Sequence, residues 1–369
     1  MSNSTSTRPC VDTLHFDVFS IVDTVLLFLL FVGLGLSCEP EDIRDALRKP
    51  KVIAVILLGQ YGLMPLLGWV FSLAGNFPPE LAVALVVCLS SPGGALSNIL
   101  TTIFQGDVAL SVGATGVSSL VAIGLMPLNQ YVYVFAAQIL PPESTICFKV
   151  VGIVWSAFIV VLAIVCGVLL KLVVRKHKWY RIIYLTYTLS GLAGVGIFVL
   201  GFVSNSASKA PWWEVPGVYF VCTIAPCIIS SVLIWAISGW MKVPGPGRLS
   251  MVLEVGIHNK LIAIAAIGFV LNREQASRAM AIPIVYQFFA SVYYAVLSIA
   301  AWKLGYTHLP RDKSFYQAFK LAREAQAERH HRLAVGRELP SSTSPAPATI
   351  EPMSSSSSLK PEESIPRQV

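Results

Sequence analysis

The sequence predicts an all-α membrane protein with about nine transmembrane helices. Its composition, its long apolar runs and the distribution of its charges all indicate this fold class. Of the 369 residues, 55% are hydrophobic and only 13% are charged, and the mean hydropathy is +0.68. A soluble globular domain carries about 25% charged residues. A chain of this length cannot hide so much apolar surface from water, so a lipid bilayer must be part of its solvent.

The apolar runs are each long enough to cross a bilayer as a helix, which takes about 20 residues. They cover residues 16–37, 51–75, 79–104, 107–138, 147–173, 181–203, 215–240, 247–271 and 280–304. The first run is expected to act as an uncleaved anchor, because no basic region followed by a short apolar core precedes it.

Three regions are expected along the chain. An N-terminal arm covers residues 1–15, a transmembrane domain covers 16–305, and a tail covers 306–369. The tail is rich in Ser, Pro and Glu after residue 340, and this composition predicts disorder there. The seven cysteines are scattered without a CxxC pair, which argues against a zinc or disulfide framework.

The Lys and Arg residues of the loops predict an exterior N-terminus and a cytoplasmic C-terminus. The loop after the first run is basic, as are the loop after the fifth run and the tail, whereas 74–80 and 139–146 contain no Lys or Arg. The loop with Arg273 and Arg278 goes against the rule. This topology explains the net charge of +7 better than nucleic-acid binding does.

The third apolar run contains a segment that should break its helix. Pro92 lacks a backbone donor, and Gly93 and Gly94 loosen the helix further. A break inside a membrane leaves polar backbone groups that lipid cannot satisfy, so they must line protein or water. Ser97 and Asn98 follow at once and offer oxygens to a cation. The alternative is a packing kink, which is common in membrane helices.

The eighth run contains a second polar segment, with Glu254, Gly256, His258, Asn259 and Lys260. One charged side chain at the centre of a membrane helix costs about 2.5–3.5 kcal/mol on insertion scales, so this cluster must face a cavity, pair internally or bind an ion. The alternative is a structural pair of the carboxylate and the ammonium, brought together by a break at the glycine. The third and eighth runs point in opposite directions, which predicts inverted repeats with two broken, crossing helices. Their free carbonyls would attract cations, and their half-helix N-termini an anion.

Other polar residues support this site. Gln60 interrupts the second run, and Ser111 and Thr115 lie four residues apart on one face of the fourth. Hydroxyl and amide oxygens with one carboxylate form a hard ligand set of low charge, which fits sodium and not a transition metal.

These segments resemble the sodium/bile acid cotransporter family over about residues 16–305. The motifs are Gln60-Tyr61-Gly62-Leu63-Met64-Pro65-Leu66, Ser91-Pro92-Gly93-Gly94 with Leu96-Ser97-Asn98, Gly106-Asp107 with Leu110-Ser111, and Glu254-x-Gly256-x-x-Asn259. The resemblance implies a core domain with two crossing broken helices and a panel domain that moves against it. It also implies a first sodium site formed by Ser97, Asn98, Ser111, Thr115 and Glu254.

A second sodium site would use Gln60, Glu254, the backbone near Val255 and Ile257, and position 258. This sequence departs from the family there, because His258 replaces the usual Gln and Lys260 replaces an uncharged residue. A neutral imidazole is a poor sodium ligand and a protonated one repels the ion. We therefore expect one sodium ion per cycle, with some pH sensitivity.

The substrate-binding role falls to Asn259 and Lys260. The ammonium of Lys260 would either reach Glu254 in place of a cation or meet the anionic group of the substrate.

The resemblance implies sodium-driven uptake of an organic anion by alternating access in the plasma membrane, with a bile-salt-like or sulfated steroid as first choice. The alternative is a proton-coupled or sodium-independent carrier of small carboxylates on the same fold. An enzyme is not expected, because no nucleophile–base pair, HExxH motif or paired catalytic carboxylates occur in the sequence. The expected partners are the anion, sodium ions and the bilayer, without nucleic acid, and the oligomeric state is left open.

Overall fold

A computed structural model describes residues 40–136 and 211–312 apart from 215 and 272, with scattered positions in 25–36, 159–206 and 314–320. The chain divides into two compact units, Met1–Glu324 and Ala325–Val369, and every described residue belongs to the first. The expected N-terminal arm, most of the tail, and most of the spans 16–37, 147–173 and 181–203 lie outside the described residues. The expected number of nine spans therefore stays a prediction.

The described part of the chain is helical, apart from one isolated pair of bridged residues, Gly93 and His258. The elements are α2 (Pro40–Leu47), α3 (Pro50–Leu58), η1 (Gly59–Leu63), α4 (Met64–Ala74), α5 (Pro79–Leu89), α6 (Ala95–Ile103), α7 (Val108–Gln130), η2 (Tyr131–Ala136), η4 (Trp212–Glu214), α10 (Gly217–Trp240), α11 (Gly245–Gly256), α12 (Lys260–Val270), α13 (Arg273–Ala279) and α14 (Ala281–Leu304).

Four helices of the described part are long and apolar enough to cross a membrane: Pro50–Ala74, Val108–Tyr133, Gly217–Trp240 and Glu274–Leu304. They coincide with four of the predicted spans. The first is continuous from α3 through the π-helical turn η1 to α4. Large hydrophobic side chains such as Val221 on α10 and Phe288 on α14 are 65% exposed, as expected for helices that face lipid.

Both helices that were expected to break do so. The predicted span 79–104 is α5 and α6, and the predicted span 247–271 is α11 and α12. At the first break, the hydroxyls of Ser90 and Ser91 donate to the carbonyls of Val86 and Cys88, each at 2.7 Å. The carbonyl of Cys88 lies in the last turn of α5, where carbonyls lack intrahelical partners, whereas that of Val86 also accepts from the amide of Ser90 at 2.9 Å.

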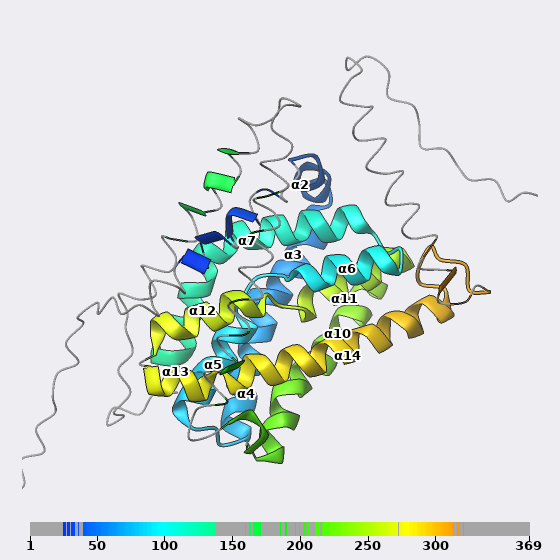
Figure 1. The fold of residues 1–369 in the computed structure, drawn as a ribbon. Helices are drawn as coiled ribbons and strands as arrows, with labels where there is room; N and C mark the ends of the chain where they lie inside the picture. The colour runs from blue at the N-terminus through cyan, green and yellow to red at the C-terminus, as the bar shows by residue number, and fades with distance from the viewer. Residues whose placement is uncertain are drawn as a thin grey trace, which may run out of the picture. The chain divides into compact units, whose positions relative to one another are not determined.

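The two breaks lie against each other. The amide of Gly94 donates to the carbonyl of Ile257 at 3.0 Å, and the amide of Asn259 donates to the carbonyl of Pro92 at 2.7 Å. These two backbone hydrogen bonds form the antiparallel bridge of the fold. Around this crossing, α6 packs on α11 and α5 packs on α12, as Figure 1 shows. The predicted crossing of two broken helices is therefore present in the structure.

Gly94 makes the close approach at the crossing possible. A Cβ at this position would lie 2.9 Å from the carbonyl oxygen of His258 and 3.3 Å from the amide nitrogen of Asn259. Both neighbours are backbone atoms that already take part in the crossing. Only glycine therefore allows the two chains to pair here.

The loop that goes against the charge rule is the short helix α13, which the sequence did not predict. Arg278 on this helix lies 3.5 Å from the carboxylate of Glu80 at the start of α5. The side chains are 33% and 12% exposed, so this arginine is partly buried against a carboxylate. A paired, partly buried cation is held by the fold, and it therefore gives little information on the orientation of the chain.

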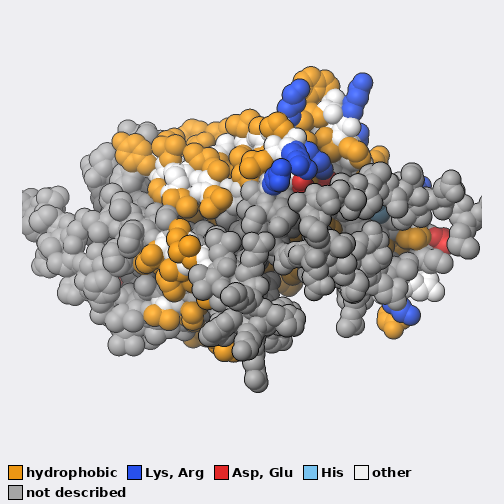
Figure 2. Space-filling view, turned by 90° about the horizontal axis from the view of Figure 1, so that it is seen from above, with side chains coloured by type: hydrophobic (Ala, Val, Ile, Leu, Met, Phe, Trp, Pro, Cys, Tyr) orange, Lys and Arg blue, Asp and Glu red, His pale blue; other side chains and the backbone are white. Residues whose placement is uncertain are grey.

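Basic side chains gather elsewhere on the surface. The exposed basic residues lie on α2, in the turn that follows it and at the start of α3: Arg44, Arg48, Lys49 and Lys51. Figure 2 shows Lys and Arg side chains clustered on a face on which most of the other described side chains are hydrophobic. This is the pattern expected where a membrane span meets an aqueous loop.

Candidate functional site

Glu254 is fully buried on α11 and lies at the centre of a cluster of hydroxyl groups. Its Oε1 accepts hydrogen bonds from Ser97 at 2.6 Å and from Ser111 at 2.5 Å, and its Oε2 accepts one from Thr115 at 2.9 Å. Ser97 comes from α6 and the other two hydroxyls from α7. Because all four groups belong to different turns of three helices, the site exists only when the crossing is formed.

Asn98 completes the cluster. Its Oδ1 lies 2.8 Å from the hydroxyl of Ser111 and 3.4 Å from that of Thr115, and its Nδ2 donates to Thr115 at 3.2 Å. The hydroxyl of Ser97 also lies 2.7 Å from the carbonyl of Gly94. The five residues expected at the first sodium site therefore form one connected network of polar contacts.

The hydroxyl groups of this cluster have fewer protons than acceptors. Three hydroxyls make six contacts with carboxylate, amide and carbonyl oxygens, two from each hydroxyl; five of them are between 2.5 and 2.9 Å and one is 3.4 Å. Each hydroxyl has only one hydrogen to donate. At any moment some of the six oxygen–oxygen contacts lack a proton between them. Such a cluster is electron-rich and favours a cation among its oxygens.

Gln60 joins the cluster to the π-helical turn η1. Its Nε2 donates to the backbone carbonyl of Glu254 at 2.6 Å, whereas its Oε1 is buried without a hydrogen-bond partner among the described residues. Of the neighbouring positions, Val255 is buried, and the carbonyl of Ile257 is already occupied by the amide of Gly94. The structure thus places Gln60 beside Glu254 and directs one free amide oxygen into the protein.

Gly93 leaves the space that Glu254 needs. A Cβ on Gly93 would lie 2.7 Å from Oε2 of Glu254 and 3.1 Å from Nε2 of Gln60. The amide of Gly93 also donates to the hydroxyl of Ser118 at 3.0 Å. At the other break, Gly256 ends α11, and a side chain there would overlap the ring of Tyr294.

His258 lies on the other side of the crossing. Its Nδ1 is 2.6 Å from the carbonyl oxygen of Ser91, and its Nε2 has no hydrogen-bond partner among the described residues. Its ring meets that of Tyr286 edge-on, with 6.3 Å between the ring centroids. The imidazole is thus bonded to the end of the α5 half of the first broken helix.

Lys260 begins α12 and is only 3% exposed. Its Nζ lies 3.6 Å from the centroid of the Tyr286 ring. Within the described part of the chain, Nζ makes neither a hydrogen bond nor an ion pair. Lys260 therefore does not pair with Glu254, because its side chain extends over the ring and Glu254 is engaged by three hydroxyls.

Asn259 caps α12. Its Oδ1 accepts from the amide of Ile262 at 3.3 Å, and its side chain is partly exposed at the N-terminus of the helix. Among the residues expected to meet the substrate, Asn259 is thus the accessible one and Lys260 is buried.

Several residues that hold the site in place were not identified from the sequence. Tyr286 donates to the carbonyl of Gly256 at 2.7 Å and lies under Lys260. Tyr61 donates to the carbonyl of Ser118 at 2.7 Å, and Asn129 donates to the carbonyl of Tyr61 at 2.9 Å. In the sequence, each of these residues is only a polar group within an apolar run. That pattern does not show which residue the polar group contacts.

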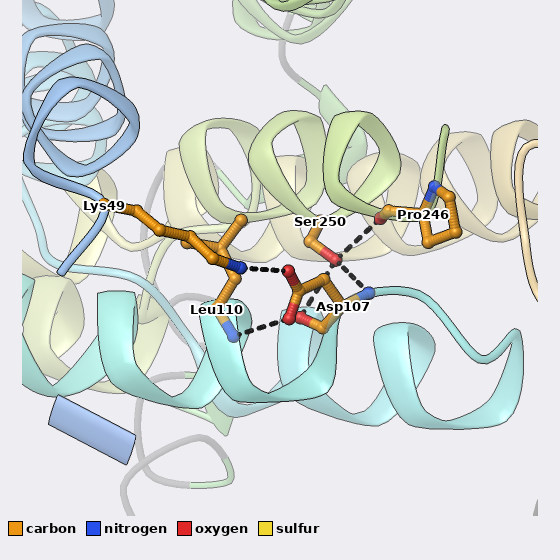
Figure 3. A network of polar contacts seen from close by, with 5 residues as sticks. All are labelled: Lys49, Asp107, Leu110, Pro246 and Ser250. Carbon is orange, nitrogen blue, oxygen red and sulfur yellow. Dashed lines mark hydrogen bonds and ion pairs between the residues drawn. The ribbon is translucent and has the colours of Figure 1, made fainter. Parts of the chain in front are cut away.

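A second polar network lies where α11 begins (Figure 3). Asp107 caps α7 by accepting from the amide of Leu110 at 3.0 Å, and its other carboxylate oxygen lies 2.8 Å from Nζ of Lys49. The hydroxyl of Ser250 lies 2.9 Å from the amide of Asp107 and 3.0 Å from the carbonyl of Pro246. This network joins three segments: the turn before α3, the start of α7 and the start of α11.

Comparison with known proteins identifies the family of the chain. The family model described as the sodium bile acid symporter family matches residues 24–208. A sodium-dependent organic anion transporter of Rattus norvegicus is 27% identical over 315 residues, covering 85% of this chain and 78% of the relative. The hepatic sodium/bile acid cotransporter of Homo sapiens is 27% identical over 301 residues, covering 80% and 83%. An ileal sodium/bile acid cotransporter of Cricetulus griseus is 28% identical over 281 residues, covering 76% and 78%.

The family and these relatives are transporters and not enzymes, in line with the expectation from the sequence. Together with its apolar helices, this similarity makes the chain an integral membrane protein. The chain belongs to the sodium bile acid symporter family.

Proposed function

We propose that the protein couples the inward movement of sodium to the uptake of an organic anion by alternating access. Sodium would bind where Glu254 meets the hydroxyls of Ser97, Ser111 and Thr115 and the amide of Asn98. The observation that carries this proposal is the excess of acceptor oxygens over hydroxyl protons around one carboxylate. A single carboxylate matches a monovalent ion, since nothing else in the cluster carries a formal charge.

Transition metals are a poor match for this site. The cluster offers oxygens only, which hard cations prefer, whereas zinc and copper prefer thiolate or imidazole nitrogen. No group of three or more His, Cys, Asp or Glu side chains gathers within the described residues. Sodium is therefore the ion we assign to the transport cycle.

Coupling would follow from the crossing itself. Because Glu254 lies on α11 while Ser97 and the other hydroxyls lie on α6 and α7, a bound ion would hold the two halves of the crossing together. The substrate anion would bind at the N-terminus of α12, where Asn259 is accessible and the helix dipole favours negative charge. Sodium and substrate would then each favour binding of the other.

The substrate that we propose is an amphipathic anion such as a bile salt or a sulfated steroid. The relatives named above are described as cotransporters of bile acids or transporters of organic anions. From the family and the predicted topology we propose the plasma membrane as the location, and from the Lys and Arg residues of the loops we propose an exterior N-terminus and a cytoplasmic C-terminus. Residues 1–15, 16–305 and 306–369 would be the exterior arm, the transport domain and the cytoplasmic tail.

The second cation site expected from the family is proposed to be inactive in this chain. Gln60 offers a free oxygen, but the imidazole of His258 bonds to Ser91 and the carbonyl of Ile257 bonds to Gly94. We therefore propose one sodium ion per cycle.

Uptake of radiolabelled taurocholate into proteoliposomes, with and without an inward sodium gradient, tests the proposal. Wild-type uptake should depend on sodium, and Glu254→Gln should abolish that dependence. Glu80→Gln is the matched control, because Glu80 is also a buried carboxylate but lies beside Arg278 instead of the hydroxyl cluster. Sodium-dependent uptake that survives Glu254→Gln would refute the assignment of the sodium site.

An alternative function is favoured by the unpartnered nitrogens of His258 and Lys260. These groups suit a carrier of small carboxylates that is driven by protons or works without sodium. Uptake of pyruvate or pantoate in sodium-free buffer, with a clear change across pH, would favour this reading. Failure of steroid conjugates to compete would support it further.

A further inference from the structure

The buried ammonium of Lys260 has no role in the site described so far. It sits on the face of Tyr286, and its remaining described neighbours include the thiols of Cys88 and Cys227, which are weak acceptors. A buried cation without a carboxylate partner is unfavourable for folding. The aromatic face offsets part of this cost because its negative charge density attracts a cation. Because its ammonium has no hydrogen-bond partner or ion pair among the described residues, Lys260 can influence the site only through the electrostatic field of its charge.

One carboxylate and one ammonium are buried at the crossing. Glu254 is 0% and Lys260 3% exposed, and the described residues contain no other formally charged side chain buried at the crossing. The two groups do not touch, because the carboxylate is bonded to hydroxyls on one side of the crossing and the ammonium lies on the other side. Their separation leaves the carboxylate open to a sodium ion.

We propose that Lys260 is a built-in cation of this carrier, which balances Glu254 when sodium is absent and makes the sodium-bound crossing positive. This inference rests on the proposed sodium site at Glu254. Without the ammonium, a carboxylate and one sodium ion would leave the crossing neutral. With it, the sodium-bound state carries one positive charge, which attracts a substrate that carries one negative charge. The substrate class is therefore a monoanion, such as a monocarboxylate or a monosulfonate.

The same charge has two measurable consequences for sodium. It repels the ion at Glu254, so it lowers the affinity of the site. It also supplies the positive charge that a second sodium ion would bring, so the wild-type protein should bind one ion. Neither consequence requires that the substrate be known.

Sodium-dependent thermal stabilisation of the purified full-length protein in detergent, titrated with sodium chloride against choline chloride, tests the proposal. The wild-type curve should fit one site with a Hill coefficient of about one. Lys260→Met should bind sodium more tightly, on the order of tenfold for loss of one repulsive unit charge in a buried site. Lys260→Gln serves as a second neutral variant, and Lys260→Arg as the control that keeps the charge and should leave the affinity near the wild-type value.

The outcomes separate the two proposals. If sodium stabilises the wild type and neither neutral variant binds it more tightly, the built-in cation is refuted and the sodium site stands. If sodium stabilises neither the wild type nor any Lys260 variant relative to Glu254→Gln, both proposals fail. If the arginine variant tightens binding as much as the methionine variant does, the effect comes from packing and the charge proposal is refuted.

Discussion

The two sides of the crossing differ in how their polar groups are satisfied. On the Glu254 side, every carboxylate oxygen has a hydroxyl partner, and Asn98 adds further bonds. On the Lys260 side, one imidazole nitrogen and the ammonium are buried without hydrogen-bond partners among the described residues. The first side therefore holds a preorganised set of oxygens, at which we propose that sodium binds. The second side carries charge that is not neutralised locally, and it can therefore influence its surroundings at a distance.

The largest effect is expected from Gly94→Ala, which would disrupt the crossing on which both sides depend. The new Cβ would press on backbone atoms of His258 and Asn259. Overpacking and the loss of backbone hydrogen bonds should lower the free energy of unfolding by about 3 kcal/mol. Gly62→Ala is the control, because a Cβ there meets nothing within 4 Å. Thermal unfolding in detergent measures both, and equal melting temperatures for the two variants would contradict the role of Gly94.

The next largest effect is expected from Ser111→Ala, which changes only the Glu254 side of the crossing. It removes the hydroxyl that contacts both Glu254 and Asn98. Hydrogen bonds to charged groups contribute about 1.5–3 kcal/mol, so sodium affinity should fall by about 10-fold to 100-fold. Ser119→Ala is the matched control, since Ser119 is buried on the same helix but bonds back to the carbonyl of Thr115. Sodium titration by thermal shift compares them, and a similar loss in both would show that the hydroxyl of Ser111 is not a ligand.

The double variant His258→Gln with Lys260→Met tests the comparison further, because it gives the Lys260 side oxygen ligands without a fixed positive charge, as on the Glu254 side. It restores an amide oxygen and removes the fixed positive charge. The Hill coefficient for sodium should rise from about one toward two, whereas His258→Gln alone should stay near one because the charge remains. The control is Lys260→Met alone, which should alter affinity without adding a site. A wild-type Hill coefficient near two that is unchanged in His258→Gln would contradict one sodium ion per cycle.

The smallest effect is expected from Lys49→Met, at the network away from the crossing. Lys49 and Asp107 are 49% and 27% exposed, and exposed ion pairs contribute about 0.2–1 kcal/mol. The loss of stability should therefore be about 0.5 kcal/mol at low salt and smaller at high salt. Arg48→Met, which removes the more exposed pair with Asp45, should have less effect. Melting temperatures at two salt concentrations would measure both. A loss of stability as large as that expected for Gly94→Ala would contradict this prediction and give the network a central structural role.

The sequence could predict the elements of the crossing because the breaks are local events. Pro92 and its neighbouring glycines end one helix without help from the rest of the fold. A cluster of charged and polar residues on an apolar run predicts a break near Gly256 in the same way. The contacts of Ser97, Ser111 and Thr115 with Glu254, and of Asn98 with two of these hydroxyls, agree with what the family resemblance implies, since the crossing brings these residues together.

The partners of Lys260 and Lys49 could not be predicted, because they depend on long-range contacts. Tyr286 looked like one more aromatic residue in an apolar run, and nothing in the sequence links it to Lys260. In the sequence, Lys49 is one of the basic loop residues that predict the orientation in the membrane. In the structure it pairs with Asp107, 58 positions away in the chain. Arg278 likewise looked like an exception to the charge rule until its contact with Glu80 gave the reason.

The π-helical turn Gly59–Leu63 has a consequence for how the length of this helix can vary. Such a turn holds one residue more than an α-helical turn would, and it is frequent at functional sites. Deleting Gly62 would remove this extra residue and return the turn to α-helical geometry. The helices on either side could keep their packing, but Gln60 would lose the position from which it donates to the carbonyl of Glu254. The length of the segment between Leu58 and Met64 therefore determines whether Gln60 reaches α11.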